Sequence, residues 1–223
     1  MSVQTADYLD YLEAIEQMPD GCMLTFEDVS WGDYESLLTE LGDHSNVRLT
    51  YDGGRLEIMS PSRKHDFIKN LLEHLVGILT EELDLKFVSI GSTTLRKEKE
   101  AKGTEPDDCF YINNVDLVIG QIISDQTPDP PPDLVIEVDI SHRSDSKFSV
   151  YAALGVPEIW RYRKEEVHFY RLTGDRYVEI PSSSIFPFLT PNILAEILNQ
   201  EYIQDFNSVK RTFREWVRAN KPR

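Results

Sequence analysis

Two acidic residues, Glu137 and Asp139, end an apolar run at positions 134–136. β-Branched residues bounded by prolines are typical of a short central strand, and alternate residues of a strand point to the same face. We therefore expect two carboxylates side by side at a buried strand end, where they repel each other and are costly to desolvate. A cation placed between them would remove both costs.

Acidic residues also stand at the start of a second expected strand, and a lysine follows Glu137 and Asp139. Glu105, Asp107 and Asp108 lead into an expected strand over 105–112, and Asp107 precedes Glu137 by thirty residues (137 − 107). Lys147 follows Glu137 by ten residues (147 − 137) and opens a helical pattern. Hard cations such as Mg²⁺ take oxygen ligands and neutralise charge on a phosphate. Acid, acid and lysine around one sheet are thus typical of a metal-dependent phosphodiesterase.

The overall charge of the chain limits which kinds of partner it binds strongly. The chain has 223 residues with 23 Lys and Arg against 39 Asp and Glu, a net charge of −16. This excess of acid argues against strong non-specific binding to nucleic acid, because phosphate contacts need clustered Lys and Arg. The charge is uneven, however: residues 1–60 hold thirteen acids and two bases, whereas residues 141–223 hold thirteen bases and ten acids. A single basic face is still compatible with this distribution.

Cysteine content and hydropathy favour the cytoplasm. The two cysteines, Cys22 and Cys109, are too few for a disulfide scaffold or a zinc cluster, and we expect Cys109 in the core. No run of about 18 apolar residues predicts a transmembrane helix, so we expect no membrane partner. Positions 1–10 also lack the pattern of a signal peptide.

The order of predicted elements indicates an α/β fold in three parts. These are an N-terminal helical appendage over 1–45, a core over 46–190 with a mixed central sheet flanked by helices, and a C-terminal helical tail over 191–223. Alternation, helical periodicity and turn residues define the elements of the core. In order they are a hairpin (47–59), a long helix (63–84), three strands (87–95, 105–112 and 134–139), a helix ended by Gly155, a strand (158–162) and a second hairpin (167–180).

Short motifs in this order carry a resemblance to a known family. They are Asp52-Gly53-Gly54-Arg55-Leu56-Glu57-Ile58-Met59-Ser60-Pro61, His65, Pro106-Asp107, Pro132-Asp133-Leu134-Val135-Ile136-Glu137-Val138, Ser141, Lys147, Tyr151 and Gly155-Val156-Pro157-Glu158-Ile159-Trp160. The set resembles the PD-(D/E)XK nuclease-like fold and, within it, the Uma-two family of restriction endonucleases. The resemblance covers about residues 20–190, and order and spacing together make it specific.

The resemblance implies a restriction-endonuclease-like core with a Mg²⁺ or Mn²⁺ site. Asp107 and Glu137 would be the metal ligands, with the carbonyl of Val138 as a third. The superfamily's plainest pattern has a lysine two residues after the glutamate, where this chain has Asp139. Lys147, on the following helix, is therefore the candidate for a catalytic lysine that has moved.

Three further side chains are weaker candidates for the site. Asp139 shares a face with Glu137 and would either ligate the metal or balance Lys147. Glu57, which precedes the long helix, would bind metal through water. His65, in the first turn of that helix, would fix the helix start or take part in the chemistry.

These observations lead us to expect a Mg²⁺-dependent endonuclease that hydrolyses phosphodiester bonds of nucleic acid, DNA in the first place. The alternative is a non-catalytic binding or interaction module that retains the fold. The acidic charge and the missing lysine favour the alternative, whereas Asp107, Glu137 and Lys147 together favour the enzyme. Because the two acids repel, we expect their loss to leave the metal-free protein equally or more stable.

We also expect a homodimer. Cutting both strands of DNA is easiest with one site for each strand, and a closed two-fold dimer is the commonest oligomer. An apolar face of the tail, formed by Val209, Phe213, Trp216 and Val217, is predicted as part of the contact.

Overall fold

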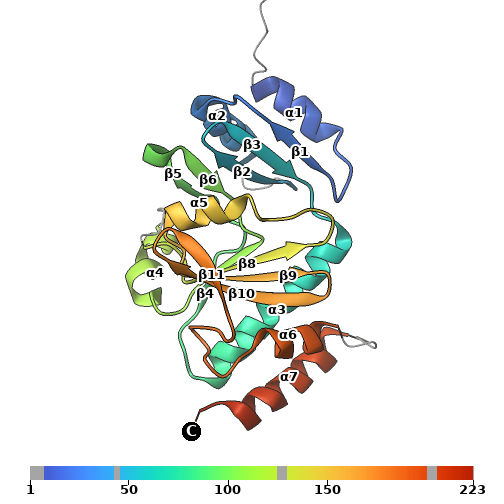
Figure 1. Ribbon diagram of the computed structural model, residues 1–223, viewed down its shortest axis with the longest axis vertical. Coiled ribbons are helices and arrows are strands. Elements are labelled where there is room, and N and C mark those ends of the chain that lie inside the picture. Colours follow the sequence, from blue (N-terminus) through green and yellow to red (C-terminus); the bar gives the residue numbers. More distant parts are fainter. Residues whose placement is uncertain (1–7, 43–45, 125–129, 200–204, 223) are drawn as a thin grey trace, which may run out of the picture.

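The computed structural model describes residues 8–42, 46–124, 130–199 and 205–222. It contains two sheets, one of six strands in the order β11-β10-β9-β8-β7-β4 and one of five in the order β1-β3-β2-β6-β5. Figure 1 shows the smaller sheet above the larger one, with α5 between them.

The elements have the following bounds. The larger sheet consists of β4 (Val88–Ser89), β7 (Asp108–Tyr111), β8 (Leu134–Asp139), β9 (Glu158–Arg163), β10 (Glu166–Thr173) and β11 (Arg176–Ile180). The smaller sheet consists of β1 (Met23–Phe26), β2 (Arg48–Asp52), β3 (Arg55–Met59), β5 (Leu95–Lys97) and β6 (Lys102–Thr104). The helices are α1 (Tyr8–Glu16), α2 (Trp31–Leu41), α3 (Arg63–Glu82), α4 (Val115–Ile123), α5 (Lys147–Leu154), α6 (Pro191–Leu198) and α7 (Phe206–Asn220), with a 3₁₀ turn η2 (Glu98–Glu100).

The larger sheet is mixed, as predicted. Strands β8 and β9 are parallel, whereas the other neighbours in this sheet are antiparallel. A parallel pair requires a crossover connection, and α5 provides it. All six residues of β8 are buried, so this strand is covered on both faces.

The two faces of β8 pack against different helices. Leu134, Ile136 and Val138 belong to the main core, together with the apolar face of α3. Val135 belongs to a second cluster with Tyr151 of α5. Because side chains alternate along a strand, the acids that follow Val135 in period two lie on the α5 face.

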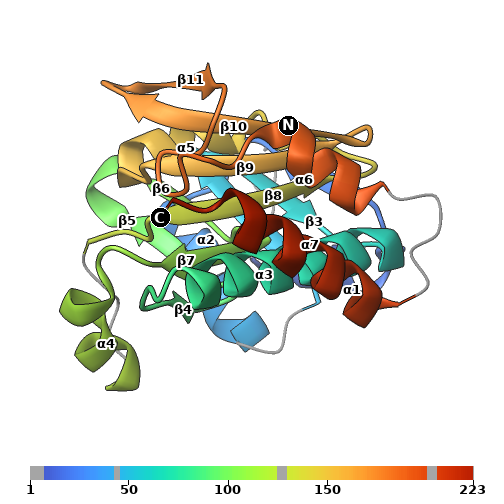
Figure 2. The ribbon, with the colours of Figure 1, turned by 90° about the horizontal axis from the view of Figure 1, so that it is seen from below.

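The tail packs against α3 along much of its length, as Figure 2 shows. Val209, Phe213 and Val217 are buried in the main core, and Trp216 packs against it. The prediction that this apolar face forms a dimer contact is therefore wrong, because the same chain covers it. Since α7 already has a partner, its burial stabilises the monomeric fold.

The N-terminal part contributes to a sheet, which the sequence patterns did not predict. Strand β1 pairs with β3, and its four residues are too few to show a period. Helix α2 begins after Ser30, whose side chain accepts a hydrogen bond from the amide of Asp33 (3.0 Å). The division of the chain into three parts at residues 45 and 190 remains a prediction.

The strand predicted over 87–95 is wrong. This segment supplies β4 to the larger sheet and begins β5 of the smaller one, so it passes between the sheets. Gly91, at φ +63°, lies in the passage and adopts a conformation that suits glycine. The segment 119–123 is the end of α4.

Asp133 joins the start of β8 to the end of β7. Its Oδ2 accepts hydrogen bonds from the amides of Ile112 (2.8 Å), Asn113 (2.9 Å) and Asn114 (3.2 Å), and its Oδ1 accepts one from the side chain of Asn114 (2.7 Å). The amide of Asp133 donates in turn to the carbonyl of Phe110 (2.9 Å). One buried carboxylate thus holds together the two ends of the β7–β8 connection, which contains α4.

Glu82, at the end of α3, fastens the tail electrostatically. Arg214 donates to its Oε1 (2.7 Å) and Arg218 to its Oε2 (2.9 Å). These two arginines, Arg218 first, lower the pKa of Glu82 from 4.5 to about 2. Two basic residues of α7, Arg214 and Arg218, are thus engaged with acids of α3 in the same chain.

We predict that Glu82→Gln weakens the fold in a pH-dependent way. A carboxyl whose pKa is lower in the folded state stabilises the fold above its unfolded pKa, and this contribution is lost as the pH falls toward the folded pKa. The free energy of unfolding should therefore fall at pH 7, and its decline between about pH 4.5 and pH 2 should become shallower. Urea unfolding at a series of pH values measures both effects. Glu81→Gln, which removes a more exposed partner of Arg214, is the control, and equal pH profiles for the two variants would contradict the prediction.

Candidate active site

The register of β7 on β8 brings the two predicted metal ligands together. Asp108 lies opposite Ile136 in this antiparallel pair, so the next position places Asp107 opposite Glu137. Opposite residues of neighbouring strands lie on the same face, within contact distance. Asp107 is 1% exposed and Glu137 is 2% exposed. Two acids thirty residues apart in the sequence therefore form one buried site.

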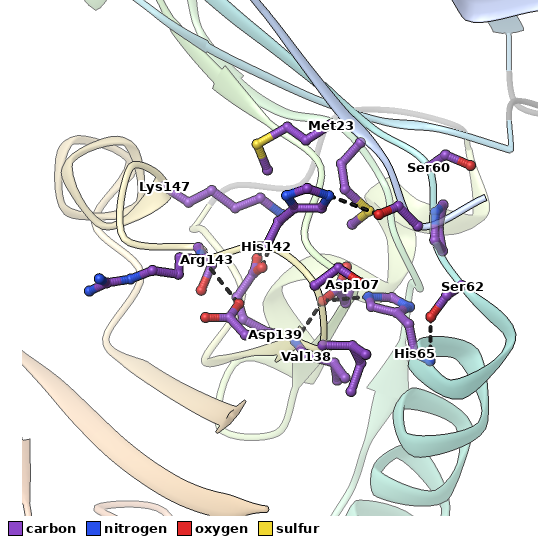
Figure 3. Close-up of a pocket in the computed structure, with 17 residues that line it drawn as sticks. Met23, Ser60, Ser62, His65, Asp107, Val138, Asp139, His142, Arg143 and Lys147 are labelled. Atoms are coloured by element: carbon purple, nitrogen blue, oxygen red, sulfur yellow. Dashed lines mark hydrogen bonds and ion pairs between the residues drawn. The ribbon is translucent and has the colours of Figure 1, made fainter. Parts of the chain in front are cut away.

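Asp107 is held through one of its two oxygens. Its Oδ2 accepts a hydrogen bond from the amide of Val138 (2.7 Å) and lies 3.0 Å from Nε2 of His65 (Figure 3). Burial raises the pKa of Asp107, but the charge of Lys147 and the contacts with His65 and Val138 bring it below its ordinary value. The carboxyl is thus ionised at neutral pH, and its Oδ1 has no hydrogen-bond partner in the part of the chain that the structure describes. A buried anionic oxygen without a donor fits a ligand for a cation.

His65 supports Asp107 from the first turn of α3. The amide of His65 donates to the side chain of Ser62, which caps the helix (3.3 Å), and its Nδ1 lies 3.1 Å from Oδ1 of Asp66. Burial lowers the pKa of His65, but Asp107 and Asp66 raise it more, so the pKa lies above its ordinary value. The imidazole therefore contacts Asp107 through Nε2 as well as marking the helix start.

Glu137 forms an ion pair with Lys147. The ammonium lies 3.1 Å from Oε1 and 3.0 Å from Oε2, and it also donates to the carbonyl of Glu105 (3.1 Å). The hydroxyl of Tyr151 donates to Oε1 as well. Burial raises the pKa of Glu137 above its ordinary value and the nearby charge of Asp107 adds to the rise, while the charge of Lys147 opposes it. Lys147, at the first position of α5, is therefore the counter-ion of the site.

Asp139 has a different partner, Arg161 of β9. Nε of Arg161 donates to Oδ2 of Asp139 (2.7 Å), while the amide of Ser144 donates to Oδ1 (3.0 Å). Arg161 also reaches Asp145 (2.9 Å), so it links the strand end to the loop that follows. Each acid at the end of β8 thus has its own protein cation, where the sequence suggested one cation between them. An arginine inside a buried strand was the signal that pointed to such a partner.

A pocket lies over these residues, as Figure 3 shows. His65, Asp107, Glu137, Val138, Asp139 and Lys147 all line it, and the loop after β8 forms another wall. That loop is joined to the N-terminal part by His142, whose Nε2 lies 2.8 Å from the carbonyl of Gly21. The structure thus gathers six of the seven candidate residues around one hollow.

Glu57, the seventh candidate, lies outside this pocket. Its Oε2 accepts a hydrogen bond from the hydroxyl of Ser146 (2.6 Å), and its Oε1 pairs with Arg55 (2.9 Å). It lines a neighbouring hollow with Asp52 and Asp145. Tyr151, to which the sequence assigned no role, contacts Glu137 instead, and its spacing of four residues from Lys147 on one helix was the available signal.

The donor set suits a hard cation. Among the described residues, no three or more His, Cys, Asp or Glu side chains group in a way that could hold a metal ion. Mg²⁺, however, is commonly bound through one or two carboxylates, with waters and substrate phosphate completing its shell. Two facing carboxylates, one with a free buried oxygen, fit that requirement. The role of the Val138 carbonyl remains a prediction, while its amide holds Asp107.

A comparison with known protein families identifies the family of this chain. The model of the family Uma2, described as "Putative restriction endonuclease", matches residues 31–201. The chain belongs to the Uma2 family. This confirms the family predicted from the motifs. No curated protein was found to match the chain.

One solved structure adds a comparison of shape. This Uma2 chain is similar to a crystal structure described as a putative nuclease belonging to DUF820 from Anabaena variabilis ATCC 29413. The two are 13% identical with a TM-score of 0.48, over 83% of this chain and 99% of the other. Within its described residues, this Uma2 chain has no helix with the length and apolar character needed to cross a membrane.

The buried ion pair reverses the expected effect of losing Glu137. We predict that Glu137→Gln leaves the Lys147 ammonium buried without its main counter-charge and lowers the free energy of unfolding by about 3 kcal/mol. The double variant Glu137→Gln/Lys147→Met should lose less than the sum of the two single variants, because both charges are then gone. Urea unfolding in EDTA measures the four stabilities. Strictly additive losses would contradict the pairing.

Proposed function

We propose that this Uma2-family chain is a nuclease that hydrolyses phosphodiester bonds of nucleic acid, DNA in the first place, with Mg²⁺ or Mn²⁺. The observation that carries the proposal is the buried Oδ1 of Asp107, which has no donor among the described residues and belongs to a side chain that lines a pocket with Glu137 and Lys147. Membership of a family described as restriction endonucleases supports the same reaction class.

Asp107 and Glu137 would hold the metal ion, with the carbonyl of Val138 as a third ligand. A divalent cation bound there would neutralise charge on the phosphate and lower the pKa of a bound water. His65 and the Val138 amide keep Asp107 ionised and aimed into the pocket. Asp139 acts through Arg161 and the Ser144 amide, since its oxygens are engaged there.

Lys147 has two tasks in this proposal. In the metal-free protein it neutralises Glu137, at 3.0 Å from Oε2. With substrate present, its ammonium would orient the attacking water or stabilise negative charge that develops on the phosphate, because a fixed charge in a buried site acts strongly. Its second anchor, the carbonyl of Glu105, keeps the ammonium in place when Glu137 takes another partner.

A second candidate function is a non-catalytic binding or interaction module. The net charge of −16 favours it, since a nuclease must bring a polyanion to its surface. A lysine fully paired with a glutamate is also what a purely structural ion pair would look like. Cleavage assays separate the two candidates.

We predict that the chain cuts plasmid or single-stranded DNA in Mn²⁺ at low salt, where weak phosphate contacts are least screened, and that EDTA stops cleavage. Asp107→Asn should slow cleavage by more than about 100-fold, because even the outer partners of metal ligands account for about 10–100-fold. Lys147→Arg should not restore the wild-type rate, since a planar guanidinium does not replace a compact ammonium.

Asp108→Asn is the matched control for Asp107→Asn. Asp108 is the adjacent buried acid, and it pairs with Lys69 of α3 outside the pocket (3.2 Å). The Asp108→Asn variant should retain most of the cleavage activity. Absence of cleavage by the wild type across several substrates and metals would favour the binding module, and unchanged cleavage by Asp107→Asn would assign the activity to another site.

We further propose a two-fold homodimer in the cytoplasm. One such site cuts one strand, so a two-fold pair would serve both strands of a duplex. The contact would lie away from the apolar face of α7, which the core occupies. Light scattering at micromolar concentration should give twice the chain mass, and a monomeric mass would end this proposal.

Cys22 and Cys109 are both free thiols, in keeping with a reducing compartment.

A further inference from the structure

Tyr151 contributes one polar atom to an otherwise apolar cluster. It lies one helical turn after Lys147 on α5 and is completely buried. Its ring packs with Leu95, Cys109, Val135, Val156 and Ile159. A phenylalanine ring would fill the same space, so the packing does not require the hydroxyl. Buried tyrosine hydroxyls need a partner, and this one donates to Oε1 of Glu137.

The two oxygens of Glu137 are therefore unequal. Oε1 receives hydrogen bonds from both Tyr151 and Lys147, whereas Oε2 receives one from Lys147. Lys147 has an alternative acceptor in the carbonyl of Glu105, but the phenol has its hydroxyl fixed on Oε1. If the ammonium shifts toward Glu105, Oε2 becomes free while Oε1 stays anchored.

We propose that Tyr151 is a positioning residue that anchors Oε1 of Glu137 and so presents Oε2 to a divalent cation. This inference rests on the proposed function and specifies how the site is prepared for its metal. Hydrogen bonds from outer partners orient ligating side chains, and their loss typically lowers metal affinity by about 10–100-fold. Tyr151 needs no contact with substrate to act in this way.

The test compares Tyr151→Phe with Tyr177→Phe in the full chain. Both substitutions remove one tyrosine hydroxyl and keep the ring. The hydroxyl of Tyr177 donates to the carbonyl of Val156 (2.6 Å), outside the pocket, so this variant reports the general effect of such a loss. Circular dichroism establishes that each variant is folded, and electron paramagnetic resonance of free Mn²⁺ gives the Kd of the metal.

Tyr151→Phe should raise the Kd for Mn²⁺ by about 10-fold or more, with Tyr177→Phe at the wild-type value. Equal Kd values for the folded variants and wild type would overturn the role of Tyr151 and leave the proposed function standing. Absence of Mn²⁺ binding by wild type at millimolar concentration would overturn the proposed metal site, and this inference with it. Thermal midpoints alone do not decide, because a purely structural hydroxyl also changes stability, so the Kd is the deciding readout.

Discussion

The ion pair between Lys147 and Glu137 is the interaction on which the rest of this structure depends. Burying either charge alone would cost several kcal/mol of desolvation free energy, and the opposite charge of the partner offsets that cost. To bring the lysine to the strand end, α5 must cross from β8 to β9 and lie between the sheets. The second bond of the ammonium, to the carbonyl of Glu105, then ties the helix to the chain just before β7. One buried lysine thus connects the crossover, the central strand and the neighbouring strand.

The same principle explains how an acidic chain keeps three carboxylates in one buried region. Asp107 has His65, Glu137 has Lys147 and Asp139 has Arg161, each basic partner coming from a different element. Charges are therefore balanced pair by pair, while the excess of acid remains elsewhere in the chain. Within the described residues, this balance leaves Oδ1 of Asp107 without a donor. That oxygen belongs to a residue that lines the pocket, where a ligand would bind.

Local patterns predicted the elements and the candidate acids, but not the contacts among them. A β-branched apolar run bounded by prolines predicted β8, the Gly-Gly turn predicted the hairpin, and helical periodicity predicted α3. Arg161 and Tyr151 were not assigned, because an arginine in a buried strand and a four-residue helical spacing do not say which residue is the partner; strand register and packing decide that. The segment 87–95 failed for a related reason: its residues serve two sheets, so no single period describes them. The resemblance predicted that Asp107 and Glu137 share one metal site, but the register that places them opposite each other was hidden by the long stretch that separates β7 from β8.

That long stretch has a consequence for how such a site can change over evolutionary time. The chain leaves β7 and returns to β8 at one point, where the carboxylate of Asp133 gathers the three amides that follow the strand. The hydrogen bonds of Asp133 join the end of β7 directly to the start of β8. The length of the segment that connects the two strands therefore does not affect their register. A one-residue slip in that register would turn Asp107 out of the pocket, but an insertion beyond the base would not cause one. The excursion around α4 is thus free to grow, shrink or carry an added module while the chemistry beneath it stays in alignment.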